Sequence, residues 1–437
     1  MKSEMKIAIL GGGITGLTAA YCLAKKNHQV TLFEKEKVLG GLAVGFKNND
    51  WNWYLERAYH HLFANDYDIL NFAKEIGFDK VFFRSPVTAS LHEFVIRNSQ
   101  LNNSTITDYG LRIFPMDTPI DLFKFPLLGL IDKLRDRIVI AFLKLSPFLS
   151  IYEKQTSEEF LRKTMGKNVW NVLWQQLFRG KYGDYAGIIL ASFIWARIKK
   201  RTKALGYIEG GFQTFINVIE EQLKNLKVEM LKGNGVGEIK KQGDKFIINN
   251  TLYDVVISTL PTPILIKVSQ QILPENYLQK LSKIKYLHAL TLILETDKPI
   301  LDKTYWLNIS TSKIPIMGIV QHTNFIDKKN YGGKHLAYLG WYLKREDKLM
   351  KMKKEELVKL VLPYLNKIQN SEFRIQNSFL FKAPFAQPIF DKKFVKNKPD
   401  FITPIKNFFI ANLDMTYPYD RGTNYAVKLG KTVAELV

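Results

Sequence analysis

The apolar positions near the start of the chain predict a strand, a helix and a second strand in close succession. Lys6–Leu10 is a short apolar run, which is typical of a buried parallel strand. Leu17–Lys26 has helical character, and Val30–Phe33 is a second apolar run. The glycine-rich segment Gly11–Gly16 joins the first run to the helix. This order predicts a βαβ-type unit of about 30 residues.

Beyond residue 65 the pattern changes to longer helical segments. A helix is predicted at Asp66–Ile76, and residues 65–205 as a whole are expected to be largely helical. Within them, Leu122–Leu145 places apolar side chains at helical spacing and charged side chains opposite. Two interpretations of that stretch stay open at this point: a helix buried against its neighbours, or a basic amphipathic helix that lies on a membrane.

Short apolar runs separated by Gly and Asn turns predict strands from residue 228 onward. The expected strands are Val228–Leu231, Glu238–Lys241, Phe246–Ile248, Val255–Ser258, Ala289–Glu295, Met317–Val320, Leu336–Tyr342 and Phe408–Ala411. Helices are predicted at Lys353–Asn366 and Thr423–Leu436. Because neither a repeat nor a low-complexity linker divides the sequence, the domains are expected to interleave along the chain.

The composition limits the classes of protein to consider. With 437 residues, 46% hydrophobic and 24% charged, the chain has the proportions of a globular protein of two or three domains. The net charge is +22, but the basic pairs are scattered and form neither a zinc-finger spacing nor an aromatic-basic RNA-binding pattern. Nucleic acid is therefore not expected as a partner. Attraction to an anionic substrate or an anionic membrane surface is favoured.

The cysteine content and the N-terminal sequence bear on where the protein works. Cys22 is the only cysteine, which excludes an intrachain disulfide and a thiolate metal cluster, and no metal site is expected. The start of the chain lacks the apolar region of a secretory signal, and no uninterrupted apolar run reaches about 18 residues. These features predict a cytoplasmic protein whose contact with a membrane would be peripheral.

The segment Gly11–Gly16 contains the spacing G-x-G-x-x-G at Gly11, Gly13 and Gly16. The first glycine permits a tight turn, the second lets the backbone approach a pyrophosphate, and the third lets helix and strand pack closely. Backbone N–H groups at the start of the following helix, from Ile14, Thr15 and Gly16, then point at the phosphates. The spacing therefore predicts a dinucleotide site.

An acidic residue ends the second predicted strand and strengthens this prediction. Glu34 follows Gly16 by 18 residues, close to the spacing at which a carboxylate binds the ribose hydroxyls of an adenosine. Lys35 lies beside it and is included in the predicted site. Both NAD(P) and FAD use this arrangement, so these residues alone do not identify the dinucleotide.

A second glycine cluster, Gly40-Gly41-Leu42-Ala43, follows Glu34. Together the two clusters resemble the extended FAD fingerprint of the amine oxidase, protoporphyrinogen oxidase and phytoene desaturase superfamily, which UDP-galactopyranose mutases share. The resemblance implies FAD as the cofactor and places the second glycine pair against the pyrophosphate and the flavin end. Many members carry Arg where this chain has Leu42, so the fingerprint does not select a subfamily.

Later segments extend the resemblance to the end of the chain. Val236 resembles the position whose backbone meets the adenine, and Asp254–Pro261 resembles the strand that returns to the FAD domain. Phe408–Asp414 resembles the strand that reaches the ribityl chain, with Asn412 and Asp414 as the candidates for that contact. The resemblance also implies a helix whose N-terminus is aimed at the flavin N1–C2=O edge, where reduced flavin gains negative charge. In this chain that helix opens with Thr423, Asn424 and Tyr425.

Three residues are candidates for chemistry beside the flavin. By resemblance, Glu56–His61 passes near the flavin ring, with Tyr59 as a cofactor contact. His60 and His61 can move protons near neutral pH, but adjacent side chains point in different directions, so only one of the two is expected to act. Arg421 either binds an anionic group of the substrate or pairs with Asp420 as a turn residue.

The resemblance implies an α/β fold with a Rossmann-like FAD-binding domain and an interleaved α+β substrate domain. The FAD-binding domain is expected at residues 1–64, 205–265 and 400–437. The helical part of the substrate domain is expected at 65–204 and its sheet part at 266–399.

The expected activity is hydride transfer to flavin N5 from a small-molecule substrate that is lipophilic, cyclic or anionic, with oxygen or quinone as the electron acceptor. Three alternatives stay open. The first is a non-redox flavoenzyme similar to a UDP-sugar mutase, and the second is a flavin-dependent amine oxidase. The third is a flavin-binding protein or membrane scaffold without catalysis.

Overall fold

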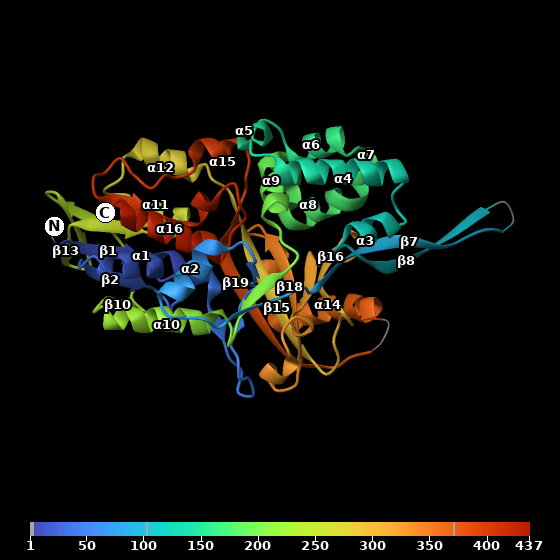
Figure 1. The fold of residues 1–437 in the computed structure, drawn as a ribbon, viewed down its shortest axis with the longest axis horizontal. Helices are drawn as coiled ribbons and strands as arrows, with labels where there is room; N and C mark the ends of the chain where they lie inside the picture. The colour runs from blue at the N-terminus through green and yellow to red at the C-terminus, as the bar shows by residue number, and fades with distance from the viewer. Residues whose placement is uncertain (1–3, 102–103, 370–371) are drawn as a thin grey trace. The chain divides into compact units, whose positions relative to one another are not determined.

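The computed structural model describes residues 4–101, 104–369 and 372–437. The chain divides into two compact units, each assembled from segments that are distant in the sequence (Figure 1). The first unit comprises Met1–Phe83, Leu205–Tyr286 and Pro388–Val437, and the second comprises Arg84–Ala204 and Leu287–Gln387.

The first unit is built on a five-stranded parallel sheet with the order β10-β2-β1-β14-β20. Its strands are β1 (Lys6–Leu10), β2 (Gln29–Glu34), β10 (Glu229–Lys232), β14 (Val255–Ser258) and β20 (Phe408–Ile410). The side chains of Ile7, Ala8 and Ile9 in the central strand are completely buried. The inner strands of a parallel sheet are covered on both faces, which is why β1 and β14 are continuous apolar runs rather than alternating ones.

The first unit also contains α-helices, several of which cover this sheet. They are α1 (Ile14–Ala24), α2 (Tyr67–Glu75), α10 (Phe212–Asn225), α11 (Thr262–Val268), α12 (Glu275–Ser282), α15 (Lys392–Asn397) and α16 (Thr423–Glu435). Helix α1 packs against both α10 and α16, and α16 packs against α2. A Cβ atom at Gly430 of α16 would lie 2.5 Å from the Thr15 carbonyl oxygen, so this glycine lets the two helices approach closely.

The first unit also contains small antiparallel elements. They are the pair β3 (Gly45–Phe46) and β4 (Leu55–Glu56), the sheet of β5 (Leu62–Phe63), β9 (Leu205–Ile208) and β6 (Val81–Arg84), and the sheet of β11 (Lys240–Gln242), β12 (Lys245–Ile248) and β13 (Thr251–Tyr253). The buried side chains of Phe246 and Tyr253 join this last sheet to a core that includes Leu10 and Phe33.

The second unit contains a seven-stranded sheet with the order β19-β15-β18-β17-β16-β7-β8. Its strands are β7 (Val87–Leu101), β8 (Ser104–Pro115), β15 (Tyr286–Thr296), β16 (Thr304–Ile309), β17 (Gly318–Gln321), β18 (His335–Leu343) and β19 (Ile375–Pro388). Its helices are α3 (Pro119–Lys124), α4 (Leu130–Leu145), α5 (Leu149–Tyr152), α6 (Ser157–Thr164), α7 (Lys167–Val169), α8 (Gln175–Tyr182), α9 (Ala191–Lys200), α13 (Lys348–Lys351) and α14 (Lys354–Gln369). One core cluster joins Leu290, Leu339 and Leu357 from this sheet and α14.

The expectation that residues 65–205 are largely helical is wrong for residues 81–115. That region forms β6 and the long strands β7 and β8, which pair antiparallel. Ala89 and Leu91 are two residues apart and both enter the core, as the period of two in a strand requires. Residues 266–286 and 388–399 were expected in the sheet part of the substrate domain. They belong instead to the first unit, where α11, α12 and α15 lie.

The structure also differs from the first interpretation of Leu122–Leu145, which was a helix whose apolar side is buried against its neighbours. It is divided between α3 and α4, and the apolar side chains that share one face of α4 are exposed. The opposite face is the buried one and carries Lys133, Asp136, Val139 and Leu143. Helical periodicity identifies which side chains share a face, but it does not say which face meets the core.

Candidate functional site

The carboxyl ends of the parallel strands in the first unit form the candidate site. Leu10, Glu34, Ser258 and Ile410 end the strands β1, β2, β14 and β20. Because these strands are parallel, their carboxyl ends lie at one edge of the sheet. In open α/β sheets ligands bind outside this edge.

Glycine occurs at positions of the first turn for two different structural reasons. Gly11 has a φ of +109°, and a Cβ there would lie 2.5 Å from Thr259 Oγ1. A Cβ at Gly16 would lie 2.0 Å from the Gly11 carbonyl oxygen. A Cβ at Gly13, in contrast, would meet only Gly41 Cα, at 3.8 Å. The fold therefore requires Gly11 and Gly16, whereas Gly13 leaves open the space in front of the turn.

The N-terminus of α1 is suited to an anion. Its N-cap is Gly13, which has no side chain to bind the first N–H groups, and its first turn is the uncharged Ile14-Thr15-Gly16. The positive end of the helix dipole and these N–H groups act in the same direction. A pyrophosphate at this position would be stabilised by backbone alone.

Glu34 lies at the end of β2 beside this turn. Its Oε2 accepts a hydrogen bond from the Gly12 N–H at 2.7 Å, and its Oε1 accepts one from the Glu36 N–H at 2.9 Å. Each carboxylate oxygen has two lone pairs, so Glu34 retains capacity for ribose hydroxyls. The turn that contains Val236 is fixed next to it, because the Asn234 N–H donates to the Glu34 carbonyl at 2.9 Å. Lys35 is exposed on the same segment.

The second glycine cluster joins the first to make one backbone surface. The Gly40 N–H donates to the Gly12 carbonyl at 2.9 Å, and a Cβ at Gly41 would lie 3.0 Å from Gly13 Cα. Both glycines of the pair have positive φ, which other residues rarely adopt. Leu42 is exposed and Ala43 is buried in the 3₁₀ turn that follows.

Gln213 and Thr259 support this surface and were not singled out by the sequence. Gln213 of α10 accepts a hydrogen bond from the Gly45 N–H at 3.0 Å through its Oε1. Thr259 Oγ1 donates to the Leu10 carbonyl at 2.9 Å and lies 3.2 Å from the Gly11 carbonyl. Thr259 lies in Asp254–Pro261, the segment that resembles the family strand that returns to the FAD domain. That resemblance is the one sequence signal that could have identified Thr259.

Replacing Thr259 by Val is expected to weaken flavin binding several-fold. The change keeps the shape of the side chain but removes the hydroxyl that holds the Gly11 turn, a loss of about 1 kcal/mol. Titration of the apoprotein with FAD, followed by flavin fluorescence, measures the effect. Thr259→Ser keeps the hydroxyl and should restore most of the affinity. Equal affinities for the Val variant and the wild type would contradict this role.

The N-terminus of α16 has the same character as that of α1. Its N-cap is Gly422, and its first turn, Thr423-Asn424-Tyr425, is uncharged. The Asn424 side chain is directed to α2, where it donates to Asp68 at 3.0 Å and accepts from the Ile69 N–H at 3.2 Å. The ring of Tyr425 stacks on another tyrosine ring at 4.9 Å. What α16 can offer a flavin is therefore chiefly its backbone N–H groups and its dipole.

Asn412 and Asp414 bind neighbouring protein groups in the structure. Asn412 Nδ2 donates to Thr262 Oγ1 at 2.9 Å and to the Leu260 carbonyl at 3.1 Å. Asp414 Oδ2 accepts hydrogen bonds from the hydroxyls of Thr262 and Tyr286, both at 2.5 Å. Burial raises the pKa of Asp414 to about 6. These contacts join β20 to the start of α11, and a ribityl contact for either side chain stays a prediction.

The loop between β4 and β5 carries Tyr59, His60 and His61, all partly buried. His60 Nδ1 lies 2.7 Å from the Ala58 carbonyl, which can only accept, so Nδ1 bears the proton and Nε2 is the acceptor of the neutral ring. Burial and, to a smaller extent, the charge of Arg421 lower the pKa of His60 to about 4. The structure thus brings His60 and Arg421 within electrostatic reach of each other. His61 makes an edge contact with a phenylalanine ring at 5.3 Å instead.

Glu56 is a buried carboxyl in the same loop region that the sequence did not single out as a functional residue. It accepts hydrogen bonds from the Tyr207 hydroxyl and from the Phe212 N–H, both at 2.7 Å. Burial raises its pKa to about 7. The ring of Phe212, the first residue of α10, also lies 5.5 Å from the ring of His60. Glu56 therefore fixes the start of α10, whose first residue contacts the ring of His60.

Comparison with known proteins shows the family. The sequence model described as "Flavin containing amine oxidoreductase" matches residues 14–437. The chain belongs to this family. As in other flavin-containing amine oxidoreductases, the flavin is FAD, and the α/β fold is the one that the family fingerprint implied.

Individual relatives of this amine oxidoreductase are similar over different lengths. The chain is 35% identical over 75 residues to 15-cis-phytoene desaturase of Synechococcus elongatus, and the match covers 17% of this chain and 16% of that protein. A protein assigned as a protoporphyrinogen oxidase from Exiguobacterium sp. 255-15 has a similar structure, with a TM-score of 0.74, 18% identity, and coverage of 99% of this chain and 98% of that chain. Reduced UDP-galactopyranose mutase is similar with a TM-score of 0.72, 15% identity, and coverage of 99% and 96%. At these identities the structural similarity shows the fold alone.

The residues of this amine oxidoreductase fit FAD. The two glycine clusters leave a backbone surface without side chains next to the uncharged N-terminus of α1. Glu34 has acceptor capacity beside it for the ribose. The N-terminus of α16 supplies a second positive dipole end within the same unit.

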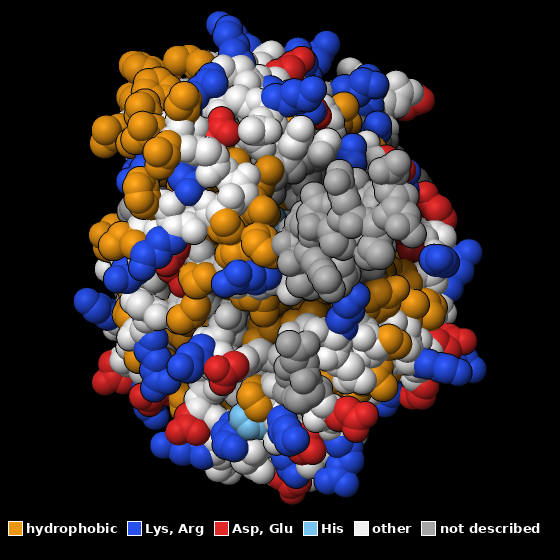
Figure 2. Space-filling model, turned by 90° about the vertical axis from the view of Figure 1, so that its right-hand side faces the viewer, with side chains coloured by type: hydrophobic (Ala, Val, Ile, Leu, Met, Phe, Trp, Pro, Cys, Tyr) orange, Lys and Arg blue, Asp and Glu red, His pale blue; other side chains and the backbone are white. Residues whose placement is uncertain are grey.

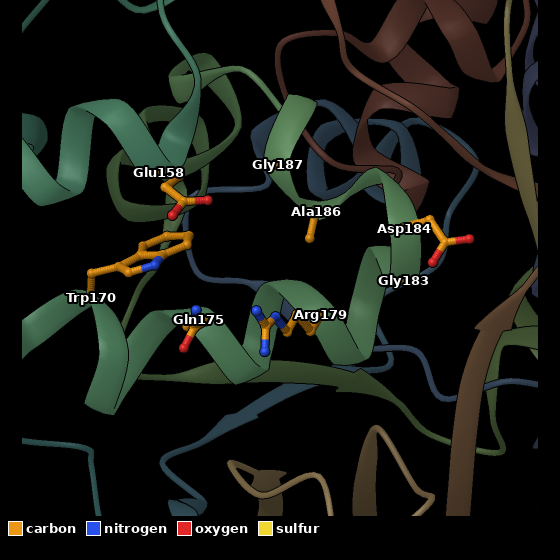
Figure 3. Close-up of a pocket in the computed structure, with 8 residues that line it drawn as sticks. All are labelled: Glu158, Trp170, Gln175, Arg179, Gly183, Asp184, Ala186 and Gly187. Atoms are coloured by element: carbon orange, nitrogen blue, oxygen red, sulfur yellow. The ribbon is translucent and has the colours of Figure 1, made fainter. Parts of the chain in front are cut away.

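The second unit of the amine oxidoreductase contains a separate pocket of about 560 Å³. Figure 3 shows Gln175 and Arg179 on α8, Ala186 on the segment that faces this helix, and Trp170 and Glu158 at one end of the pocket. Glu158 also pairs with an arginine of its own helix at 2.7 Å. The lining comes entirely from the second unit, so this pocket is distinct from the glycine surface.

Proposed function

We propose that the protein is an FAD-dependent oxidoreductase that takes a hydride from a small-molecule substrate. The proposal rests on one observation above all: two glycine clusters form a continuous bare backbone surface at the uncharged N-terminus of α1. FAD supplies the redox chemistry when bound, because the flavin ring accepts the hydride at N5. The residues of the chain bind the cofactor, orient it and adjust the charge around it.

We assign the cofactor contacts as follows. The N–H groups of Ile14, Thr15 and Gly16 hold the pyrophosphate, and Gly40 and Gly41 leave the backbone beside it free of side chains. Glu34 binds the ribose hydroxyls, and the backbone near Val236 meets the adenine. The N-terminus of α16 stabilises negative charge at the N1–C2=O edge.

His60 acts in this proposal as a neutral hydrogen-bond acceptor. A pKa of about 4 means that the ring is uncharged at neutral pH, with Nε2 available to accept a proton or a hydrogen bond. Arg421 lies within electrostatic reach and would bind an anionic group of the substrate. His61 and Tyr59 complete the loop beside them.

We propose a lipophilic or cyclic substrate, with oxygen or quinone as the electron acceptor. This choice is supported by the similarity to phytoene desaturase and to a protein assigned as a protoporphyrinogen oxidase. A second candidate is a non-redox rearrangement of a sugar nucleotide. The net charge of +22 suits a nucleotide diphosphate, and the fold of reduced UDP-galactopyranose mutase is similar.

The purified protein is expected to show flavin absorption bands. In the absence of oxygen, these bands should bleach when a polyene or a porphyrinogen is added, and they should return when oxygen or a quinone is admitted. Absence of flavin bands, with no gain on adding FAD, would overturn the proposal. Turnover of a sugar nucleotide that needs prior flavin reduction but consumes no reductant would support the second candidate instead.

A further inference from the structure

One face of α4 in the second unit is apolar and exposed. Its side chains, which we call the α4 face, are Leu130, Ile131, Leu134, Ile138, Phe142 and Leu145. Their exposed fractions run from 55% to 80%. At about 100° per residue, they occupy an arc of about 120° on the helix, which is one continuous stripe. Figure 2 shows apolar side chains gathered at the upper left, on the side where Figure 1 places α4.

The elements before and after α4 in the chain also expose large apolar side chains. Phe123 of α3 is 52% exposed and Phe148, just beyond the end of α4, is 63% exposed. Soluble monomers rarely expose contiguous apolar patches of this kind unless the patch binds something. Among the residues that the structure describes, no helix is both long and apolar enough to cross a membrane.

Basic residues border the α4 face on both sides. Arg135 lies next to one edge of the apolar arc, and Arg137 and Lys144 lie next to the other, by the same helical geometry. Lys144 Nζ also donates to the carbonyls of Lys199 and Arg201, at 3.0 and 2.7 Å, which brings the basic end of α9 beside the C-terminus of α4. The border of the face is therefore positively charged.

The acidic residues of α4 lie away from this face. Asp136 is on the buried side of the helix and is only 1% exposed, and burial raises its pKa to about 7. Asp132 is partly buried and accepts a hydrogen bond from Asn168 at 3.2 Å. The exposed stripe thus combines an apolar centre with a basic border.

We propose that the α4 face docks on the surface of an anionic lipid bilayer. An apolar helical stripe with Lys and Arg at its borders can bury its centre at the level of the acyl chains while the basic groups reach the headgroups. The charge argues against a second copy as the occupant, because two chains of net charge +22 repel each other. An anionic surface attracts the same border.

Co-sedimentation with lipid vesicles tests the proposal. The full-length protein with its flavin should sediment with vesicles of mixed phosphatidylglycerol and phosphatidylcholine, and far less with phosphatidylcholine alone. The variant Ile131→Ser/Ile138→Ser/Leu145→Ser should lower the apparent affinity by ten-fold or more, because it removes three apolar groups from the stripe. Ile402→Ser is the matched control, since Ile402 of the first unit is 67% exposed and Ile138 is 69% exposed. The control should bind like the wild type.

A charge variant tests the basic border separately. Arg135→Gln should reduce binding to phosphatidylglycerol vesicles about five-fold and make it less sensitive to salt, as expected for about 1 kcal/mol per basic group. Unchanged binding in this variant would overturn the part assigned to the border.

Three results would overturn the proposal as a whole. The first is that the wild type does not sediment with anionic vesicles. The second is that the triple variant binds these vesicles as tightly as the wild type does. The third is that the wild type forms a concentration-dependent dimer, which the triple variant does not form, while neither protein binds vesicles. If the triple variant does not fold, Ile138→Ser alone carries the test. Flavin content, measured in the same samples, reports on the proposed function independently, because the α4 face lies outside the unit that carries the glycine clusters.

Discussion

Replacing Gly13 by Ala is expected to lower the affinity for FAD by ten-fold or more while the protein stays folded. Gly13 has an ordinary φ of −74°, and a Cβ there would meet only Gly41 Cα at 3.8 Å, so the fold accepts the methyl group. The methyl group would occupy the space in front of the helix N-terminus, where the pyrophosphate approaches the backbone. Loss of phosphate hydrogen bonds at that point costs on the order of 2 kcal/mol. Fluorescence titration of the apoprotein with FAD measures the change.

A matched control for this variant lies at the start of α4. Gly129 is also a helix N-cap and has nearly the same backbone, with φ −72° and ψ 165° against φ −74° and ψ 172° for Gly13. A Cβ at Gly129 would have no heavy atom within 4 Å among the described residues. Gly129→Ala should therefore change neither stability nor FAD affinity beyond the small effect of any helix-cap substitution. Equal FAD affinities for both variants would show that the cofactor does not approach Gly13.

Replacing Glu56 by Gln is expected to change how stability depends on pH. Burial raises the pKa of Glu56 to about 7 in the folded protein, above its ordinary value of 4.5. The folded state therefore binds more protons than the unfolded state between these values, and the free energy of unfolding falls as the pH rises through them. The contribution of this one group is on the order of 3 kcal/mol. It is fully present below pH 4.5 and lost above pH 7.

The Gln variant keeps an acceptor for the Phe212 N–H but carries no charge at any pH. Its stability relative to the wild type should rise steadily between pH 5 and pH 8, as measured by urea unfolding at several pH values. Glu221→Gln serves as the control, because it removes one carboxylate at an exposed position of α10. Parallel curves for Glu56→Gln and the wild type would contradict the assignment of this titration to Glu56.

Local sequence patterns predicted the part of the site that is built from neighbouring residues. The spacing of Gly11 and Gly16 is readable because the third glycine packs on the carbonyl of the first, five residues away. The positions of strands β1 and β14 can be predicted from the sequence because a strand that is covered on both faces is apolar throughout. Where the controlling contacts are local, the residues carry the information themselves.

The rest of the site depends on contacts between distant segments. Gln213 meets Gly45 across 168 residues, Thr259 meets Leu10 across 249, and Phe212 meets Glu56 across 156. No local spacing in the sequence predicts contacts between residues this far apart. The same limit explains α4, where the pattern showed an amphipathic helix but its orientation depends on what packs against Val139 and Leu143.

The interleaved strand order of the first unit has a consequence for how the protein is made. The Lys6 N–H donates to Asp254 Oδ2, and these residues are 248 positions apart. At about 5–20 residues per second, a ribosome needs roughly 12–50 s to deliver β14 after β1 has been synthesised. Strand β20 and helix α16 come later still, after the last segment of the second unit. Strand β1 can pair with β2 early, but its other edge must stay unpaired until β14 has been made. The surface that includes the N-terminus of α16 is complete only when the last segment of the chain has been synthesised.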